Sequence, residues 1–312
     1  MSFDILAVGK ALGKKKIDLR NQFKENVFNR IYNTTGVKYL YKLSEKQNLQ
    51  SLNLESYQNL ICKTKVDLES LDLIISVNQT SEYMLPGIAN IIASKIKAKK
   101  NVICIDLSSG CSGFVQALDL ADKYFISGIK SALIFCSDAY SRIIDESDKS
   151  TYLLFSDCST ATYLKRNKYK KSISSSFGND GENFQHLSCS NKIIDNNTRP
   201  SLVMNGTKVY QFTLSKVIPS LDSFLKKNYN YKIKFLLLHQ ASKLVLETFI
   251  SKLNLEKSKV PMNLSTYGNT VSSSIPLVVE DLITNKSIKK GEYIILCGFG
   301  VGLSWGMILY EW

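Results

Sequence analysis

The sequence predicts an α/β protein made of two similar halves. Short, bulky apolar runs bounded by turn residues alternate with amphipathic stretches of helical period, which is the pattern of buried strands and covering helices. The same succession of strand, loop, helix and closing strands describes residues 73–164 and again residues 235–310, although the letters do not repeat. A chain of 312 residues is long enough to bury a sizeable core. We therefore expect layers of sheets and helices.

Eight apolar runs are predicted as strands and four amphipathic stretches as helices. The strands are Leu73–Val77, Val102–Leu107, Ala132–Cys136, Ala161–Leu164, Phe235–Leu238, Val260–Leu264, Tyr293–Cys297 and Gly306–Tyr310. The helices are Gly113–Ile126, Gln211–Lys227, Lys243–Lys252 and Pro276–Ile283. Residues 165–200 are polar and are expected to join the halves, which we place at residues 1–168 and 169–312.

The composition predicts a cytoplasmic protein with an acidic partner. No apolar run approaches the roughly 18 residues of a membrane span, and the N-terminal apolar run precedes its lysines, the reverse of a signal peptide. The formal net charge of +13 suits carrier protein, the phosphates of coenzyme A or nucleic acid. Because the lysines are scattered and not interleaved with aromatic residues, we expect no nucleic-acid binding. The cysteines and histidines show no metal-ligand spacing, so no metal is expected.

Cys111 is the strongest candidate for a nucleophile. It follows a predicted strand and a Ser-Ser-Gly turn, and it precedes an apolar-periodic run that starts at Phe114. That places it at the first turn of a buried helix, where free backbone N–H groups and the helix dipole favour a thiolate and can hold an oxyanion. We therefore expect a lowered pKa for Cys111. Gly110 and Gly113 beside it allow a tight turn and the close approach of a substrate.

Three further features supply partners for this cysteine. Of the two histidines, His239 ends a predicted strand and should face the crevice at the carboxyl edge of the sheet, whereas His186 lies in a polar stretch and is expected at the surface. Asn269 sits in a turn after a predicted strand. The glycine-rich run at 298–306 precedes no helix, so we expect backbone N–H groups aimed at an acyl oxygen and not a dinucleotide site.

These pieces, in this order, resemble the β-ketoacyl-acyl-carrier-protein synthase III family. The likeness rests on DLSSGCSGF around Cys111, LLLHQAS around His239, YGNTVSSSIP around Asn269 and GFGVGLSWG at the last turn. It spans most of the chain, from about Gly36 to Trp305. The resemblance implies an α/β thiolase fold, in which two pseudo-equivalent halves form a five-layered αβαβα sandwich, and it implies a homodimer.

The resemblance also implies a role for each site residue. Cys111 would take an acyl group from a thioester delivered by coenzyme A or acyl carrier protein, with no separate cofactor. His239 and Asn269 would hold the carbonyl of malonyl-acyl-carrier protein and promote its decarboxylation. The carbanion would then attack the acyl-cysteine, whose oxygen would face the N–H groups of Cys111 and Val301. The implied reaction is a decarboxylative Claisen condensation.

Departures from the family pattern fall in the coenzyme A site. Family members of the fatty-acid type usually clamp adenine with a tryptophan and an arginine near the N-terminus, and the matching stretch here has Arg30 and Thr34 and no tryptophan. Lys149 stands where an arginine assists the coenzyme, and Ser242 replaces an asparagine. We expect Lys149 and Ser242 at the substrate site, with Leu85 filling the acyl tunnel across the dimer. These changes favour a specialised pathway.

Two other functions stay open. The first is acyl transfer from Cys111 to a sugar or amine without condensation, which Asn269 disfavours because plain transfer does not need a decarboxylation pair. The second is a non-catalytic partner subunit of a condensing enzyme. Such subunits typically lose the nucleophile, whereas this chain keeps Cys111, His239 and Asn269 together.

Overall fold

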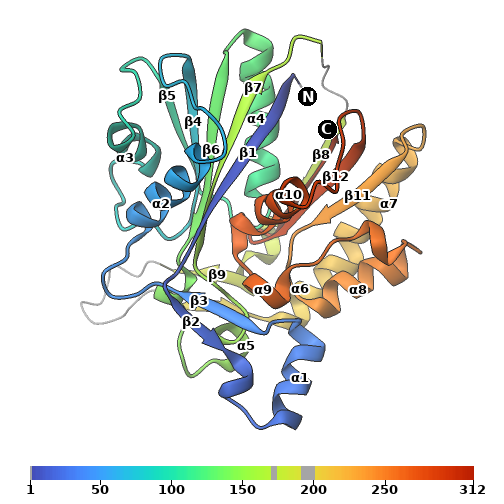
Figure 1. Cartoon of the computed structure of the whole chain (residues 1–312). Coiled ribbons are helices and arrows are strands. Elements are labelled where there is room, and N and C mark those ends of the chain that lie inside the picture. The colour runs from blue at the N-terminus through green and yellow to red at the C-terminus, as the bar shows by residue number, and fades with distance from the viewer. Residues whose placement is uncertain (1, 170–173, 191–200) are drawn as a thin grey trace.

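Two β-sheets, one from each half of the chain, form the frame of the protein (Figure 1). The computed structural model describes residues 2–169, 174–190 and 201–312. The first sheet contains β1 (Phe3–Leu12), β4 (Leu71–Val77), β5 (Ile103–Leu107), β6 (Ser131–Asp138) and β7 (Cys158–Arg166). The second contains β8 (Ser174–Asn179), β11 (Ile233–Leu238), β12 (Tyr293–Gly300) and β13 (Ser304–Glu311).

Two small sheets and ten α-helices complete the described part of the chain. The small sheets pair β2 (Lys15–Asp18) with β3 (Tyr39–Lys42), and β9 (Leu187–Cys189) with β10 (Leu202–Met204). The helices are α1 (Glu25–Thr35), α2 (Leu49–Ile61), α3 (Ile88–Lys95), α4 (Gly113–Ser127), α5 (Lys149–Tyr152), α6 (Gly206–Phe212), α7 (Ile218–Lys227), α8 (Lys243–Lys252), α9 (Leu264–Tyr267) and α10 (Ser274–Thr284). None of these helices is both long and apolar enough to cross a membrane.

The two sheets share one pattern of strand connections. In the first sheet β4 runs parallel to β6, β7 is antiparallel to β6, and β1 is antiparallel to β7. In the second sheet β11 runs parallel to β12, β13 is antiparallel to β12, and β8 is antiparallel to β13. The first sheet has one more strand, β5, which lies parallel to β4 at the edge. The duplicated strand pattern predicted from the sequence is therefore present.

Helices cover both faces of each sheet, which explains the continuous apolar runs of the central strands. Along β4, Leu73 and Ile75 pack with α4 and α10 between the sheets, whereas Ile74 packs with α2 and α3 on the outer face. Along β12, Leu296 joins the inner cluster and Ile295 joins the cluster under α7 and α8. Successive side chains of a strand point to opposite faces, so each strand serves two cores. Figure 1 shows α4 and α10 between the sheets and α2, α3, α7 and α8 outside them.

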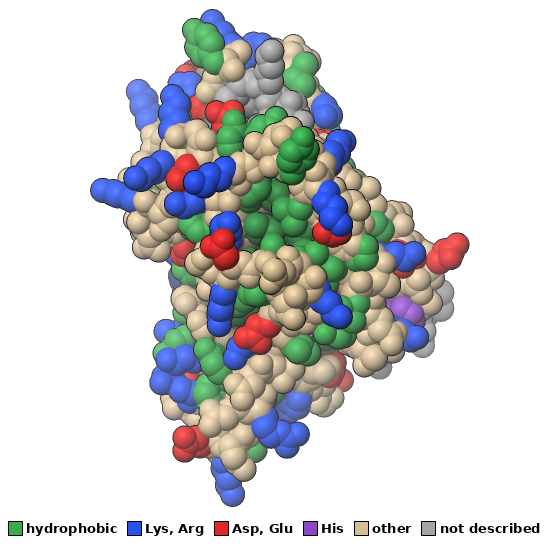
Figure 2. All heavy atoms as spheres, turned by 90° about the vertical axis from the view of Figure 1, so that its right-hand side faces the viewer, with side chains coloured by type: hydrophobic (Ala, Val, Ile, Leu, Met, Phe, Trp, Pro, Cys, Tyr) green, Lys and Arg blue, Asp and Glu red, His purple; other side chains and the backbone are tan. Residues whose placement is uncertain are grey.

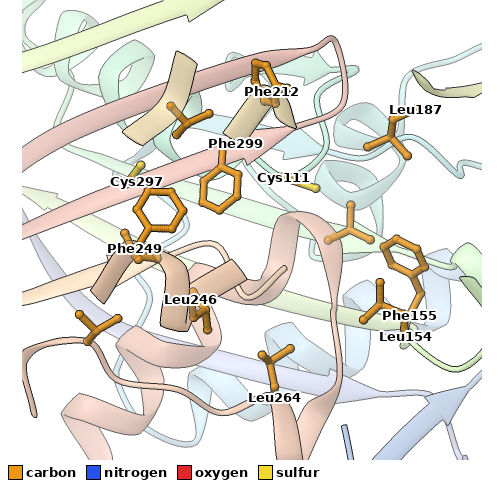
Figure 3. Packing of buried hydrophobic residues seen from close by; sticks show 14 of the residues in the cluster. Cys111, Leu154, Phe155, Leu187, Phe212, Leu246, Phe249, Leu264, Cys297 and Phe299 are labelled. Atoms are coloured by element: carbon orange, nitrogen blue, oxygen red, sulfur yellow. The ribbon is translucent and has the colours of Figure 1, made fainter. Parts of the chain in front are cut away.

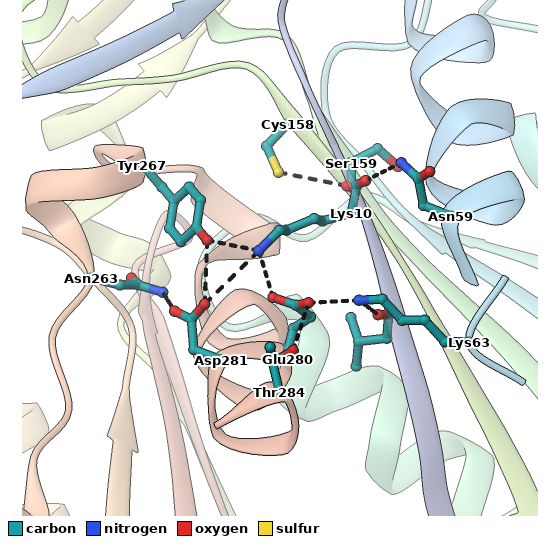
Figure 4. A network of polar contacts seen from close by, with 11 residues as sticks. Lys10, Asn59, Lys63, Cys158, Ser159, Asn263, Tyr267, Glu280, Asp281 and Thr284 are labelled. Atoms are coloured by element: carbon teal, nitrogen blue, oxygen red, sulfur yellow. Dashed lines mark hydrogen bonds and ion pairs between the residues drawn. The ribbon is translucent and has the colours of Figure 1, made fainter. Parts of the chain in front are cut away.

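An ion-pair cluster links β1 with α10 across the two halves (Figure 4). Glu280 accepts hydrogen bonds from the ammonium groups of Lys10 and Lys63, each at 2.6 Å. Lys10 also donates to the Tyr267 hydroxyl at 2.8 Å. The Glu280 side chain is only 6% exposed, so its charge depends on these two lysines for compensation. The cluster fixes the middle layer against the first sheet.

One predicted strand is wrong, and two strands, β8 and β9, are found where a connection was predicted. Residues 260–263 form no strand, and Leu264 begins α9. Pro261 has no N–H to give to a ladder, and burial of Val260 and Leu264 in the core accounts for the apolar run without strand pairing. In the polar stretch 165–200, by contrast, Ser174–Asn179 forms β8, whose serines carry no apolar alternation but pair with β13.

Candidate active site

Cys111 stands at the entry to the central helix α4. The first helical residue is Gly113, its N-cap is Ser112, and the Gly113 N–H donates to the carbonyl of Gly110 at 2.9 Å. The Cys111 side chain is 6% exposed. The strand-to-helix turn expected from the sequence is therefore present, and it places the sulfur at the N-terminal end of a buried helix.

The hairpin of β12 and β13 presses against this cysteine. A Cβ on Gly298 would lie 2.7 Å from the Cys111 carbonyl oxygen, and a Cβ on Gly300 would lie 2.8 Å from its Sγ. Gly300 also has a φ of +153°, which side chains rarely adopt. The backbone N–H groups of Val301 and of Cys111 lower the pKa of the thiol, as expected for N–H groups beside the sulfur. The alternating glycines thus bring the hairpin backbone, including the N–H of Val301, close to the nucleophile.

Burial raises the pKa of the Cys111 thiol to about 12, and the buried Asp138 adds to the rise, while the two N–H groups act in the opposite sense. A helix N-terminus contributes at most about 2 kcal/mol, or about one and a half pH units, in favour of the thiolate. That contribution is smaller than the rise caused by burial. The expectation of a lowered pKa is therefore wrong, and the cysteine in this structure is a neutral thiol.

His239 is a neutral, buried imidazole fixed at one nitrogen. Its Nδ1 lies 2.7 Å from the Ser274 hydroxyl, and its ring meets Phe299 edge-on with centroids 5.5 Å apart. Burial lowers the pKa of His239 to about 3, so the ring is uncharged at neutral pH. The hydrogen bond to Ser274 occupies Nδ1 and leaves Nε2 for a substrate.

Asn269 is held so that one amide hydrogen remains for the substrate. Its Oδ1 accepts the N–H of Val271 at 2.9 Å, and its Nδ2 donates to the carbonyl of Ala241 at 3.2 Å. A primary amide has two N–H donors, so one of them is not used by this contact. Val271 adopts a φ of +53°, which is rare for a β-branched residue. This backbone conformation at the site places the Val271 N–H on the amide oxygen of Asn269.

Cys111, His239 and Asn269 line one cavity of about 130 Å³. Its walls are largely apolar and include Phe155 and Phe299; Figure 3 shows both with Cys111 in the packed core. The uncharged forms of the thiol and the imidazole agree with this apolar environment. The three residues predicted from separate motifs therefore meet in one chamber.

The other predicted site residues divide between the cavity and the surface. Ser242 lines the cavity and caps α8, accepting the Val245 N–H at 3.3 Å. Lys149 is exposed and donates to the Glu146 carbonyl at 2.6 Å, outside the cavity. Leu85 is 85% exposed within the single chain. His186 ends a 3₁₀ segment and does not line the cavity.

Two side chains at the site were not singled out from the sequence. Ser274 holds the His239 ring, and it lies in the motif YGNTVSSSIP, of which only Asn269 is assigned a role from the sequence. Tyr140 lines the cavity and donates to the Oε1 of Gln79 at 3.0 Å. Nothing in the local sequence around Tyr140 indicates this contact, because the two residues lie 61 positions apart.

Comparison with known proteins places the chain in a family. Residues 105–181 match the family described as 3-oxoacyl-[acyl-carrier-protein] synthase III, and residues 229–312 match its C-terminal part. The β-ketoacyl-[acyl-carrier-protein] synthase III of Prochlorococcus marinus is 33% identical over 96% of this chain and 90% of the relative. The chain belongs to the 3-oxoacyl-[acyl-carrier-protein] synthase III family.

Further relatives agree with this assignment. The synthase III of Clostridium novyi is 32% identical and aligns over 89% of this chain and 88% of its own length. The crystal structure of the 3-oxoacyl-[acyl-carrier-protein] synthase III from Aquifex aeolicus superposes with a TM-score of 0.87 at 26% identity, covering 99% of this chain and all of the other. The α/β architecture of two equivalent halves is the thiolase fold of synthase III enzymes.

Proposed function

We propose that this chain is a condensing enzyme that joins an acyl group carried on Cys111 to malonyl-acyl-carrier protein with loss of carbon dioxide. The observation that carries the proposal is the meeting of Cys111, His239 and Asn269 in one buried cavity. A thiol nucleophile with two backbone N–H groups suits acyl transfer, and two neutral donors suit the stabilisation of an enolate. Membership of the synthase III family supports the same reaction.

In the first half-reaction the Cys111 sulfur attacks the acyl thioester, and the oxyanion faces the N–H groups of Val301 and Cys111. Because the thiol starts neutral, its proton leaves during the attack and passes to the departing sulfur of the donor thioester. An acyl-cysteine and a free donor thiol result, so atoms and charge balance.

In the second half-reaction malonyl-acyl-carrier protein loses carbon dioxide, and its thioester carbonyl becomes an enolate. With the Ser274 hydroxyl donating to Nδ1, the His239 ring carries its proton on Nε2 and donates it as a hydrogen bond to this oxygen; Asn269 donates from Nδ2. The enolate carbon attacks the acyl-cysteine carbonyl. Collapse of the tetrahedral intermediate gives the 3-oxoacyl-carrier protein and returns the Cys111 sulfur, which takes up one proton from solvent.

The charge distribution supports an acidic carrier protein as the donor and acceptor of thioesters. The chain carries a formal net charge of +13, and Figure 2 shows lysine and arginine side chains spread over one face. Lys208 on α6 and Lys243 on α8 belong to helices whose residues line the cavity. Positive charge at this mouth would steer an acidic partner toward Cys111. The acyl group comes as a carrier-protein or coenzyme A thioester, with no separate cofactor.

The edge of the first sheet supports a homodimer. Within the described residues β5 pairs with β4 on one side only, and Ile103 on that edge is 40% exposed. The adjoining loop leaves Met84 and Leu85 76% and 85% exposed, and the Ile88 N–H that follows it donates to Asp106 of β5 at 2.8 Å. An apolar edge of this kind is covered in a stable protein, and a second copy of the chain offers the same surface. In such a dimer Leu85 would belong to the partner's acyl tunnel.

The free cysteines bear on the compartment of the enzyme, and the altered coenzyme A site bears on its acyl donor. All seven cysteines are free, as in the reducing cytoplasm where we place the protein. Arg30 and Thr34 are exposed on α1, where family members of the fatty-acid type clamp adenine with tryptophan and arginine. We therefore propose a specialised pathway, in which the altered clamp favours an acyl donor presented on carrier protein over a coenzyme A thioester.

Intact-mass measurement tests the function directly. Incubation with acyl-carrier protein should add one acyl group to the protein but none to Cys111→Ala. Added malonyl-carrier protein should then release carbon dioxide and regenerate the free thiol, and His239→Ala and Asn269→Ala should abolish that release while folding normally. No adduct from either donor class would overturn the proposal. Release of an acylated sugar or amine without carbon dioxide would instead favour simple acyl transfer.

A further inference from the structure

Tyr140 and Leu187 stand between the cavity that holds Cys111 and a second cavity. The first has a volume of about 130 Å³, and the second, of about 300 Å³, shares Tyr140 and Leu187 with it. A third cavity, of about 790 Å³, shares Gln79 and Val301 with the second. The three cavities therefore form a row that starts at the nucleophile, and Tyr140 stands at the first division.

Tyr140 is fixed in this position from both ends. Its side chain is 3% exposed, and its ring packs on Phe155 with centroids 4.9 Å apart. Its hydroxyl donates to Oε1 of Gln79 at 3.0 Å. Gln79 is itself anchored, because its backbone N–H donates to the buried Asp138 at 2.9 Å. The glycine at 110 leaves room for this amide, since a Cβ there would lie 2.4 Å from the Gln79 Oε1. A wall held by a buried hydrogen bond and by packing does not swing aside freely.

We propose that Tyr140, held by Gln79, is the wall that restricts the acyl group on Cys111 to about six carbons or fewer. This inference rests on the proposed function, because it concerns the acyl group that Cys111 carries. An apolar cavity of about 150 Å³ is just large enough for a six-carbon ring. The cavity of about 130 Å³ around Cys111 is no larger, and part of it faces His239 and Asn269, where the thioester must lie.

The space behind the wall suits a longer chain once the ring is removed. The second cavity is lined by apolar side chains that include Ile143, Phe184 and Leu202. Loss of the Tyr140 ring would connect it to the cavity of Cys111, because both cavities use that ring as a wall. One methylene too many in a closed apolar pocket costs about 10- to 200-fold in specificity. Octanoyl groups should therefore be strongly disfavoured by the native chain and accepted by a variant without the ring.

Acylation rates of Cys111 with synthetic donors test the wall. The probes are N-acetylcysteamine thioesters of acetyl, butyryl, hexanoyl and octanoyl groups, which need neither coenzyme A nor carrier-protein contacts. The measured quantity is the octanoyl-to-butyryl ratio of the rates of mass gain. In the native chain this ratio should be below about one tenth, and Tyr140→Ala should raise it by about tenfold or more. Tyr140→Phe keeps the ring and should keep the ratio within about threefold of native.

The possible results separate this inference from the proposed function. A native chain that takes octanoyl and butyryl groups equally fast overturns the inference and leaves the function intact. A folded Tyr140→Ala protein whose octanoyl-to-butyryl ratio equals that of the native chain also overturns the inference and leaves the function intact. If the alanine variant does not fold, Tyr140→Leu replaces it, because leucine keeps an apolar contact with Phe155. Its octanoyl-to-butyryl ratio is then compared with that of the native chain. Failure of every thioester to acylate the native chain overturns both.

Discussion

The Nδ1 atom of His239 lies 2.7 Å from the hydroxyl oxygen of Ser274, and both side chains are buried. Ser274 is the first residue of α10, the helix that the second half contributes to the middle layer. The orientation of the imidazole is therefore set by the packing of a central helix and not by a mobile loop. Because this contact occupies Nδ1, Nε2 is the ring nitrogen that meets the substrate. A neutral ring has one donor nitrogen and one acceptor nitrogen, so the contact also bears on which of them carries the proton.

Removal of that hydroxyl should slow decarboxylation more than acyl transfer. In Ser274→Ala the His239 ring loses the partner of Nδ1, so its Nε2 proton is no longer fixed toward the enolate. We expect carbon dioxide release to fall by about tenfold, the equivalent of one hydrogen bond of about 1.4 kcal/mol. Stopped assays of carbon dioxide and of acyl-Cys111 mass separate the two steps. Ser287→Ala, an exposed serine beyond the same helix, should change neither step. Equal loss in both steps would contradict this role.

A methyl group at Gly300 should block the nucleophile. Its Cβ would lie 2.8 Å from Sγ of Cys111, a distance at which one of the two must move. We expect Gly300→Ala to lose acylation by more than about tenfold, since a displaced sulfur leaves the N–H groups of the oxyanion site. The matched control is Gly291→Ala, where φ is also positive, at +85°, but nothing lies within 4 Å of the new Cβ. It should lose about 1 kcal/mol of stability from backbone strain and keep acylation.

The chemistry of the site could be predicted from the sequence because each residue sits in its own short motif. Cys111 follows β5 of the first sheet and His239 follows β11 of the second, so the end of a buried strand marks each of them, whereas Asn269 follows an apolar run that is not a strand. The pKa of Cys111 could not be predicted in this way. It depends on burial by the hairpin at Gly298 and Gly300 and on the nearby Asp138, which are far away in the sequence.

The fold shows the same division between local and distant causes. The central strands could be predicted because burial on both faces makes them apolar throughout, as at Leu71–Val77. The strand Ser174–Asn179 could not, because its residues carry no apolar pattern and its place is set by pairing with β13. The converse error at Val260–Leu264 arose because core burial alone produced a strand-like run. Tyr140 and Gln79 form a wall that is evident only from the structure, because the two residues are in contact but lie far apart in the sequence.

The reactivity of Cys111 should rise with pH throughout the neutral range. Burial raises its pKa to about 12, so the thiolate fraction grows about tenfold per pH unit from pH 6 to 9 without reaching a plateau. Alkylation by iodoacetamide, followed by mass mapping of the Cys111 peptide, measures this profile. The exposed Cys62 provides an internal comparison on the same chain. A plateau for Cys111 below pH 8 would show a stabilised thiolate and contradict the neutral thiol.

Glu280→Gln should destabilise the protein by weakening the contact between its two halves. Burial alone would raise the pKa of Glu280, but hydrogen bonds from Lys10 and Lys63 lower it below its usual value. A carboxyl with a lowered pKa stabilises the fold above the pKa of the unfolded chain, 4.5, and loses that contribution as the pH falls through its folded value. We expect the free energy of unfolding to fall by about 2 kcal/mol at pH 7, less than for a fully buried pair because both lysines are partly exposed.

Urea unfolding at pH 7 should show this difference in stability between Glu280→Gln and the native chain, and the difference should shrink as the pH drops below 4.5. Asp222→Asn, which breaks the exposed pair with Lys226, should cost no more than about 0.5 kcal/mol at either pH, so an equal loss in both variants would contradict a structural role for Glu280.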